Sequence, residues 1–335
     1  MNDILTGSLV HLSCNTGAEN TSVDKLTFDE KLWNDIVEET AKSGQNAMFI
    51  ALGDGVIFNS HPEIAIPGAW TRQRLRQEIK RLKEMGITLM PKMNFSAMHD
   101  NWLGIYSRMI GTPTYYHVCR DLILEVCQIF RDAPYFHIGL DEEWPKSIHS
   151  FEQYGVVRQN ELFWHDANFF LECVREGGLT PVMWDGRAIA MYDEFKKNIS
   201  RDEVVIFQTY YHAVKKEHWT RIDSNEMYKT YYSTREPYKY MNLTYVEEDP
   251  YYVDFRKNAF KMIEDGYDCM FGVSCYYNNP YNTEDVVEMY STQAPREHVK
   301  GYFTLPWLRT LPENREPWLK SIRELSAAIQ KYNVL

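Results

Sequence analysis

Short hydrophobic runs alternate with longer amphipathic runs along the chain. The short runs are apolar on both faces and rich in β-branched and aromatic residues, which is typical of buried strands in a parallel sheet. We predict strands at residues 8–13, 46–55, 87–95, 135–143, 181–186, 204–212, 269–279 and 301–307.

An amphipathic run follows each predicted strand, with apolar residues three and four positions apart, as on one face of a helix. The first, at 27–44, has Thr27 and Glu30 at the spacing of a capping box and ends at Gly44. The other predicted helices lie at 72–86, 117–130, 161–178, 189–198, 249–266, 284–294 and 317–332.

This series of eight strand–helix units predicts an α/β protein, a single-domain (β/α)8 TIM barrel over residues 1–335. Residues 213–249 break the alternation, and we expect an extended loop insertion there, after the sixth strand. The sequence lacks the glycine-rich GxGxxG and GxxxxGK patterns, which argues against a nucleotide-binding doubly wound sheet.

The composition narrows the classes of partner. The chain is 44% hydrophobic and has a formal net charge of −11 without a basic cluster, which argues for a large core and against nucleic-acid binding. No apolar stretch reaches the about 18 residues of a membrane span, and the N-terminus does not read as a signal peptide, so we expect a cytoplasmic protein without membrane contact. The composition is compatible with a homo-oligomer.

The 6 cysteines are scattered without a CxxC pair, so we expect buried thiols and no cofactor.

The ends of the predicted strands carry unusual residues. In (β/α)8 barrels the chemistry takes place at the C-terminal ends of the strands. Here those ends hold acids, amides and aromatic residues, and they include Asn15, Asp54, Lys92, Asn94, Asp141, Glu142, Glu143, Trp184, Asp185, 208–211, 276–278 and Trp307. Aromatic faces suit the C–H side of a sugar ring, and acids and amides suit its hydroxyl groups. The sequence therefore predicts a carbohydrate site, although turn or helix-start roles stay open for Asp54, Asp185 and the pair His99–Asp100.

The stretch HIGLDEE, residues 137–143, resembles the His-x-Gly-Gly-Asp-Glu motif of the family-20 glycoside hydrolases, the β-N-acetylhexosaminidases. The matching residues are His137, Gly139, Asp141 and Glu142, and Leu140 replaces the second glycine. Residues 90–99 are similar to the family's Pro-Glu-Ile-Asp-x-Pro-Gly-His stretch, which equates His99 with its substrate-contacting histidine. Residues 182–186 resemble its fifth-strand Trp-Asp/Glu motif.

The resemblance implies substrate-assisted cleavage of 2-acetamido glycosides. Glu142 would then be the general acid, and Asp141 would orient the acetamide group. Either Tyr210 or Tyr276 would bind the acetamide oxygen, and Trp184 and Trp307 would wall the sugar pocket. The remaining candidates for substrate contact are Lys92, Asn94, His99, Asp100, His137, Glu143 and Asp185. The seventh predicted strand contains no carboxylate, which argues against a nucleophile from that strand.

Several departures from the family leave further functions open. The first strand end lacks an arginine, and Lys92 and Asn94 stand where the family has acids, so an anionic sugar is one possible substrate. A non-acetamido glycosidase could pair Glu142 with Asp185 or Asp54 as base. A catalytically inactive carbohydrate-binding barrel would also fit the sequence, as would a metal-dependent hydrolase that uses His11, Asp54, His137 and Asp185.

Overall fold

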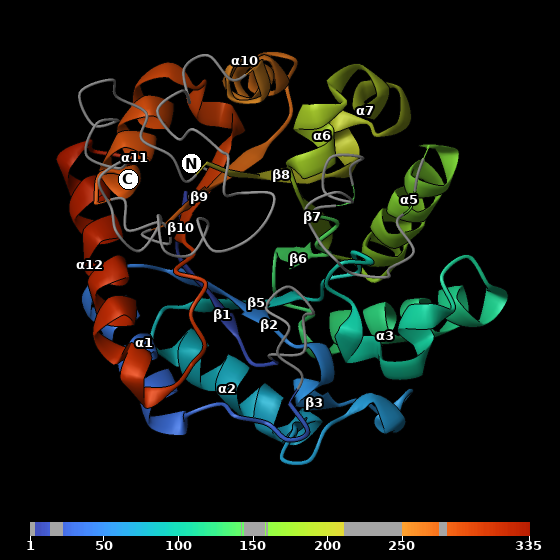
Figure 1. The fold of residues 1–335 in the computed structure, drawn as a ribbon. Coiled ribbons are helices and arrows are strands. Elements are labelled where there is room, and N and C mark those ends of the chain that lie inside the picture. Colours follow the sequence, from blue (N-terminus) through green and yellow to red (C-terminus); the bar gives the residue numbers. More distant parts are fainter. Residues whose placement is uncertain are drawn as a thin grey trace, which may run out of the picture.

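In the computed structural model of the protein, parallel strands close into a barrel that helices surround (Figure 1). The structure describes residues 4–13, 23–141, 143, 158, 160–210, 250–274 and 280–335, with only the backbone for 250–256. Within these residues the barrel has eight strands, and the prediction of a (β/α)8 barrel is confirmed. The strands are β1 (Leu5–His11), β2 (Ala47–Ala51), β5 (Thr88–Lys92), β6 (Tyr135–His137), β7 (Thr180–Trp184), β8 (Val205–Thr209), β9 (Cys269–Val273) and β10 (Val299–Thr304).

Adjacent strands of the barrel pair in parallel, and β10 pairs with β1 to close it. A small separate sheet pairs β3 (Val56–Ile57) with β4 (Trp70–Thr71). The surrounding helices are α1 (Glu30–Lys42), α2 (Arg72–Glu84), α3 (Pro113–Ile129), α5 (Asn160–Glu176), α6 (Gly186–Ala190), α7 (Tyr192–Asn198), α10 (Pro250–Glu264), α11 (Asn282–Gln293) and α12 (Arg315–Lys331). The predicted insertion at 213–249 lies outside the described residues.

Several helix starts differ from the predictions, and two of the differences have a clear local cause. The cap of α1 is Asp29 rather than Thr27, because the Asp29 carboxylate accepts a hydrogen bond from the Leu32 N–H at 2.6 Å. Helix α3 begins earlier than predicted, at Pro113. There the Thr112 hydroxyl accepts a hydrogen bond from the Tyr115 N–H, and proline favours the first helical position.

Alternation along each strand divides the hydrophobic residues into two cores. Val182 and Trp184 point into the barrel, whereas Met183 between them packs toward the helices. The same alternation gives β5 an inward column of Met90, Lys92 and Asn94, and it gives β1 the inward residues Leu9 and His11. The barrel interior is therefore apolar at its base and becomes polar toward the C-terminal ends of the strands.

The cysteines that the structure describes, Cys119, Cys127, Cys173 and Cys269, are buried free thiols, as predicted. Cys14 and Cys275 lie outside the described residues. In the described part of the chain, no helix has the length and apolar character that a membrane crossing requires.

A glycine determines how closely β1 and β2 approach. Gly7 is the register partner of Ala47, and a Cβ atom on Gly7 would lie 1.6 Å from the Ala47 carbonyl oxygen. We therefore expect Gly7→Ala to lower the free energy of unfolding by about 3 kcal/mol or more, measured by chemical denaturation. In the control Gly86→Asn, the glycine has a φ of +79° and no neighbour within 4 Å, so a change below about 1 kcal/mol is expected. Equal effects of the two substitutions would contradict this account of the strand contact.

Candidate active site

The chain turns sharply where it leaves β6. Gly139 and Leu140 both adopt left-handed backbone conformations, with φ of 79° and 69°. For Leu140 this conformation costs about 1–2 kcal/mol. The turn fits closely against the β5 end, because a Cβ atom on Gly139 would lie 1.9 Å from the Asn94 Oδ1 atom, which also accepts a hydrogen bond from the Leu140 N–H at 3.3 Å. This turn brings Asp141 to the end of the neighbouring strand β5.

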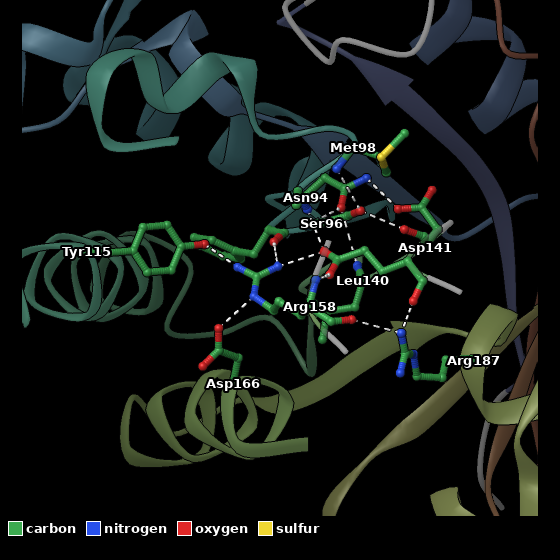
Figure 2. A network of polar contacts seen from close by, with 12 residues as sticks. Asn94, Ser96, Met98, Tyr115, Leu140, Asp141, Arg158, Asp166 and Arg187 are labelled. Atoms are coloured by element: carbon green, nitrogen blue, oxygen red, sulfur yellow. Dashed lines mark hydrogen bonds and ion pairs between the residues drawn. The ribbon is translucent and has the colours of Figure 1, made fainter. Parts of the chain in front are cut away.

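Asp141 is held on both carboxylate oxygens. The Asn94 Nδ2 atom donates to its Oδ1 at 2.9 Å, and the His99 Nε2 atom lies 3.4 Å from its Oδ2. The Ser96 hydroxyl donates to the Asp141 backbone carbonyl at 2.6 Å (Figure 2). The Asp141 side chain is nevertheless 23% exposed. The structure thus brings the 137–143 motif and the 90–99 stretch together around one oriented and accessible carboxylate.

A layer of rings and one cation lies at the same end of the barrel. The Trp184 ring centroid is 4.2 Å from that of His137 and 5.8 Å from that of Trp307, and Trp307 lies 5.7 Å from the His11 ring. The Lys92 ammonium lies 5.6 Å from the centre of the Trp184 ring. Trp184 and His137 are buried, whereas Trp307 is half-buried and has a left-handed φ of 54°. Of the two predicted pocket walls, Trp307 is therefore the more accessible.

Burial determines the charge states in this layer. Burial, together with the charges of Lys92 and His99, lowers the pKa of His11 to about 3. Burial and Lys92 likewise hold the pKa of His137 well below its usual value. The pKa of Lys92 is lowered to about 8 by burial, against the attraction of the Asp141 charge. Near neutral pH both histidines are therefore neutral, and Lys92 carries a positive charge beside Asp141.

The two carboxylates considered as possible bases are buried. The Asp185 oxygens accept hydrogen bonds from the Thr209 N–H at 2.9 Å and the Thr209 hydroxyl at 3.1 Å, which ties the ends of β7 and β8 together. Burial raises the pKa of Asp185 to about 7, although the hydrogen bonds from Thr209 oppose the shift. Asp54 accepts a hydrogen bond from the Ser13 hydroxyl. Neither carboxylate has the solvent access of Asp141.

Glu143 lies in a buried ionic network rather than at the barrel mouth. The fully buried Arg158 guanidinium donates to the Glu143 Oε1 atom and the Asp166 Oδ2 atom, both at 2.6 Å. It also donates to the Tyr115 hydroxyl at 2.6 Å and to the Phe95 carbonyl at 3.0 Å (Figure 2). The sequence predicts a substrate contact for Glu143, and its burial with both oxygens engaged corrects that prediction.

This network also fixes the position of Glu143, which follows Asp141 and Glu142 in the sequence. The Ala97 N–H donates to the Glu143 carboxylate at 2.5 Å, and the Arg158 N–H donates to its other oxygen at 3.1 Å. Arg187 of α6 donates to the backbone carbonyls of Glu143 and Arg158, at 2.9 Å for the latter. Glu142 itself lies outside the described residues, but both of its neighbours in the sequence are held by polar contacts.

Two further predicted contacts need correction. Asp100 is buried and close to the Arg158 network, and burial raises its pKa to about 8, with the charge of Arg158 opposing and that of Glu143 adding to the shift. Tyr210 packs in the core between the barrel and the helices, because it continues the outward-facing series of Ile206 and Gln208 on β8. Neither side chain is placed to contact a sugar at the mouth. The second tyrosine candidate, Tyr276, lies outside the described residues.

The sequence analysis missed Arg158, Asp166 and Arg187. One signal was available, because Asp166 lies on the apolar face of its helix with Phe163, Ala167 and Phe170. An acid on a buried face requires a buried cation as partner. Nothing in the sequence before the helix identified Arg158 as that partner.

The hypothesis of a metal-dependent hydrolase gains no support from the described residues. Among them, no group of three or more His, Cys, Asp or Glu side chains is arranged to hold a metal ion. The His137 Nδ1 atom accepts a hydrogen bond from the Gly139 N–H at 3.0 Å, and its ring packs among aromatic residues. Asp185 is engaged with Thr209.

A comparison of the sequence with models of known protein families finds no match. Solved structures are similar over nearly the whole chain. An exo β-N-acetylglucosaminidase of glycoside hydrolase family 20 from Vibrio harveyi, in an inactive mutant form, has a TM-score of 0.61 and 15% identity over 97% of this chain and 54% of that one. The family-20 β-N-acetylhexosaminidase from Streptomyces coelicolor A3(2) has a TM-score of 0.61 and 12% identity over 96% of this chain and 63% of that one.

Dispersin B matches over 99% of this chain and 100% of its own length, with a TM-score of 0.56 and 13% identity. The chain spans 54% and 65% of the lengths of the first two similar structures, from Vibrio harveyi and Bacteroides fragilis. At these identities the similarity concerns the fold. This chain has a (β/α)8 barrel similar to the barrels of these structures, and His137 is the last residue of β6.

Proposed function

We propose that this chain is a retaining glycoside hydrolase that cleaves 2-acetamido glycosides with help from the substrate's own acetamide group. The observation that carries the proposal is the Asp141 carboxylate, which Asn94 and His99 orient at the C-terminal end of the barrel, the end at which Trp184 and Trp307 also lie. The similar structures are described as β-N-acetylhexosaminidases and a β-N-acetylglucosaminidase, which supports the same chemistry. The partner is a carbohydrate, and residues 1–335 form one catalytic domain with an insertion at 213–249.

Glycoside cleavage normally uses two carboxyl groups, one as acid and the second as nucleophile or base. The sequence of β9 contains no carboxylate, and Asp54 and Asp185 are buried and hydrogen-bonded. A nucleophile from the substrate removes the need for a second exposed carboxylate. In our proposal, the acetamide oxygen attacks the anomeric carbon while Glu142 protonates the departing oxygen, which gives an oxazolinium intermediate. Glu142 then takes a proton from the water that opens this ring, and the anomeric configuration is retained.

Asp141 has two tasks in this scheme. Its carboxylate accepts the hydrogen bond of the acetamide N–H, which points the acetamide oxygen at the anomeric carbon. Its negative charge then stabilises the positive charge of the oxazolinium ring. Because Asn94 and His99 already hold the carboxylate, little reorganisation is needed during the reaction. Trp307 and Trp184 supply apolar contact for the sugar, and Tyr276 remains the candidate partner of the acetamide oxygen.

The first prediction from this mechanism concerns Glu142 as the general acid. We expect Glu142→Gln to lower kcat by ~10²-fold or more on substrates with poor leaving groups, because these need protonation of the departing oxygen. Aryl glycosides with good leaving groups should lose much less. Steady-state kinetics on a series of leaving groups makes the measurement, and equal losses across the series would remove Glu142 from the acid role.

The second prediction concerns the nucleophile. The wild-type protein should cleave aryl 2-acetamido glycosides far better than the matching 2-hydroxy glycosides, and a thiazoline mimic of the cyclic intermediate should inhibit it strongly. Asp141→Asn should reduce kcat on the 2-acetamido substrate by ~10²-fold, since an amide cannot balance the oxazolinium charge. Efficient cleavage of 2-hydroxy glycosides without thiazoline inhibition is the result that would refute substrate assistance.

The third prediction concerns the buried network. Glu143→Gln leaves Arg158 short of one charged partner, so the residues that flank Glu142 should lose their fixed position. We expect kcat to fall about tenfold with little change in KM, and the loss should be larger for poor leaving groups than for good ones. The control is Glu172→Gln, an exposed acid on α5. If Glu143→Gln lowers only the thermal stability and leaves kcat unchanged, the network stabilises the fold without positioning the acid.

A further inference from the structure

Lys92 is a buried cation whose charge no described side chain neutralises directly. It is only 2% exposed and lies on the inward face of β5, between Met90 in the barrel core and Asn94, which binds Asp141. Its ammonium lies over the Trp184 ring, and in the described part of the chain no carboxylate forms an ion pair with it. A buried ammonium without an anionic partner is unfavourable by several kcal/mol. The Asp141 charge attracts this ammonium without forming an ion pair, so a closer anion at the barrel mouth would stabilise it further.

The charge of Lys92 conflicts with the reaction proposed above. The substrate-assisted step creates a positive charge beside Asp141, and the Asp141 carboxylate is there to balance it. The positive charge of Lys92 acts on the same carboxylate and opposes a second cation nearby. The neighbouring rings of His11 and His137 are neutral and supply no compensating charge. A neutral sugar would therefore form its oxazolinium ion in a site whose negative charge is already partly cancelled.

We propose that the substrate carries its own negative charge, and that Lys92 binds it. The substrate class is a 2-acetamido sugar that bears a carboxylate, sulfate or phosphate group. This inference rests on the proposed function, since the conflict exists only if an oxazolinium ion forms. Such an anion would pair with the buried ammonium and leave the charge of Asp141 available for the reacting 2-acetamido group. Asp141 and Trp307, at the same end of the barrel as Lys92, are both partly exposed.

The substrate test compares aryl 2-acetamido glycosides that differ only in charge. The neutral N-acetylglucosaminide is measured beside its 6-sulfate, its 6-phosphate and the corresponding uronate. We expect at least one anionic substrate to exceed the neutral one in kcat/KM by about tenfold or more, which is the strength of a charged hydrogen bond. The three arms identify which anion is bound. A wild-type protein that prefers the neutral glycoside to all three anionic ones would overturn the proposal and leave the proposed function intact.

Variants of Lys92 test whether this residue causes the preference for anionic substrates. Lys92→Met keeps the length of the side chain and removes the charge, so the ratio of anionic to neutral kcat/KM should fall about tenfold. Lys92→Arg keeps the charge and should retain most of the preference. The control Lys83→Met removes a lysine that is 69% exposed on α2 and should leave the ratio unchanged. A ratio that Lys92→Met does not alter contradicts the assignment, and thermal melting shows whether each variant is folded.

A binding measurement separates this proposal from the proposed function. Titration calorimetry with the free 6-sulfate, 6-phosphate and uronate sugars does not require catalysis. Binding of one of them by the wild-type protein, weakened about tenfold in Lys92→Met, supports the anion site even if no glycoside is cleaved. If neutral N-acetylglucosamine binds as tightly as the anionic sugars in both proteins, Lys92 serves only as a fixed counter-charge to Asp141, and the proposal is wrong.

Discussion

Arg158 is a fully buried cation between two fully buried carboxylates, and the geometry of the candidate site depends on it. Asp166 lies on α5, and Glu143 and Arg158 precede this helix in the sequence. The guanidinium also binds the loop after β5 and a tyrosine of α3. Removing such groups from water costs several kcal/mol per ion, so the network is a weak argument for stability. The network instead fixes the positions of the residues that it joins, because the planar guanidinium can satisfy all of its charged hydrogen bonds in few arrangements.

Two sets of contacts, one at Asp141 and one at Glu143, therefore hold the chain on either side of Glu142 in the sequence. Asp141 is oriented from the β5 loop through Asn94, Ser96 and His99, and Glu143 is oriented through Arg158. The left-handed turn at Gly139 and Leu140 separates these residues from the regular strand. Strain at this turn is compatible with a functional site, since the surrounding contacts compensate for a conformation that a leucine rarely adopts.

Much of the fold could be predicted from the sequence, because each strand and helix carries its own hydrophobic period. The sequence also placed the 137–143 motif at the end of the fourth barrel strand, and β6 does end at His137. The side-chain directions could not be predicted, because regular alternation stops at His137, before Asp141 is reached. Asp141 and Glu143 would share a face in a continuous strand, yet they point to different surroundings. Asp100 also lies beyond the regular alternation of its strand, and its burial shows that it does not face the mouth. Tyr210 could have been excluded from the sequence, because it has the parity of Ile206 on β8 and therefore faces the helices.

The central claim is that the substrate supplies the nucleophile at Asp141, and the stereochemistry of the reaction tests it most directly. The anomeric form of the first sugar released from a β-aryl 2-acetamido glycoside can be followed by proton NMR before mutarotation. The account predicts that the β-anomer appears first, because two displacements at the anomeric carbon retain its configuration. Initial release of the α-anomer would mean a single displacement by water, with a protein carboxylate as base, and would contradict the account.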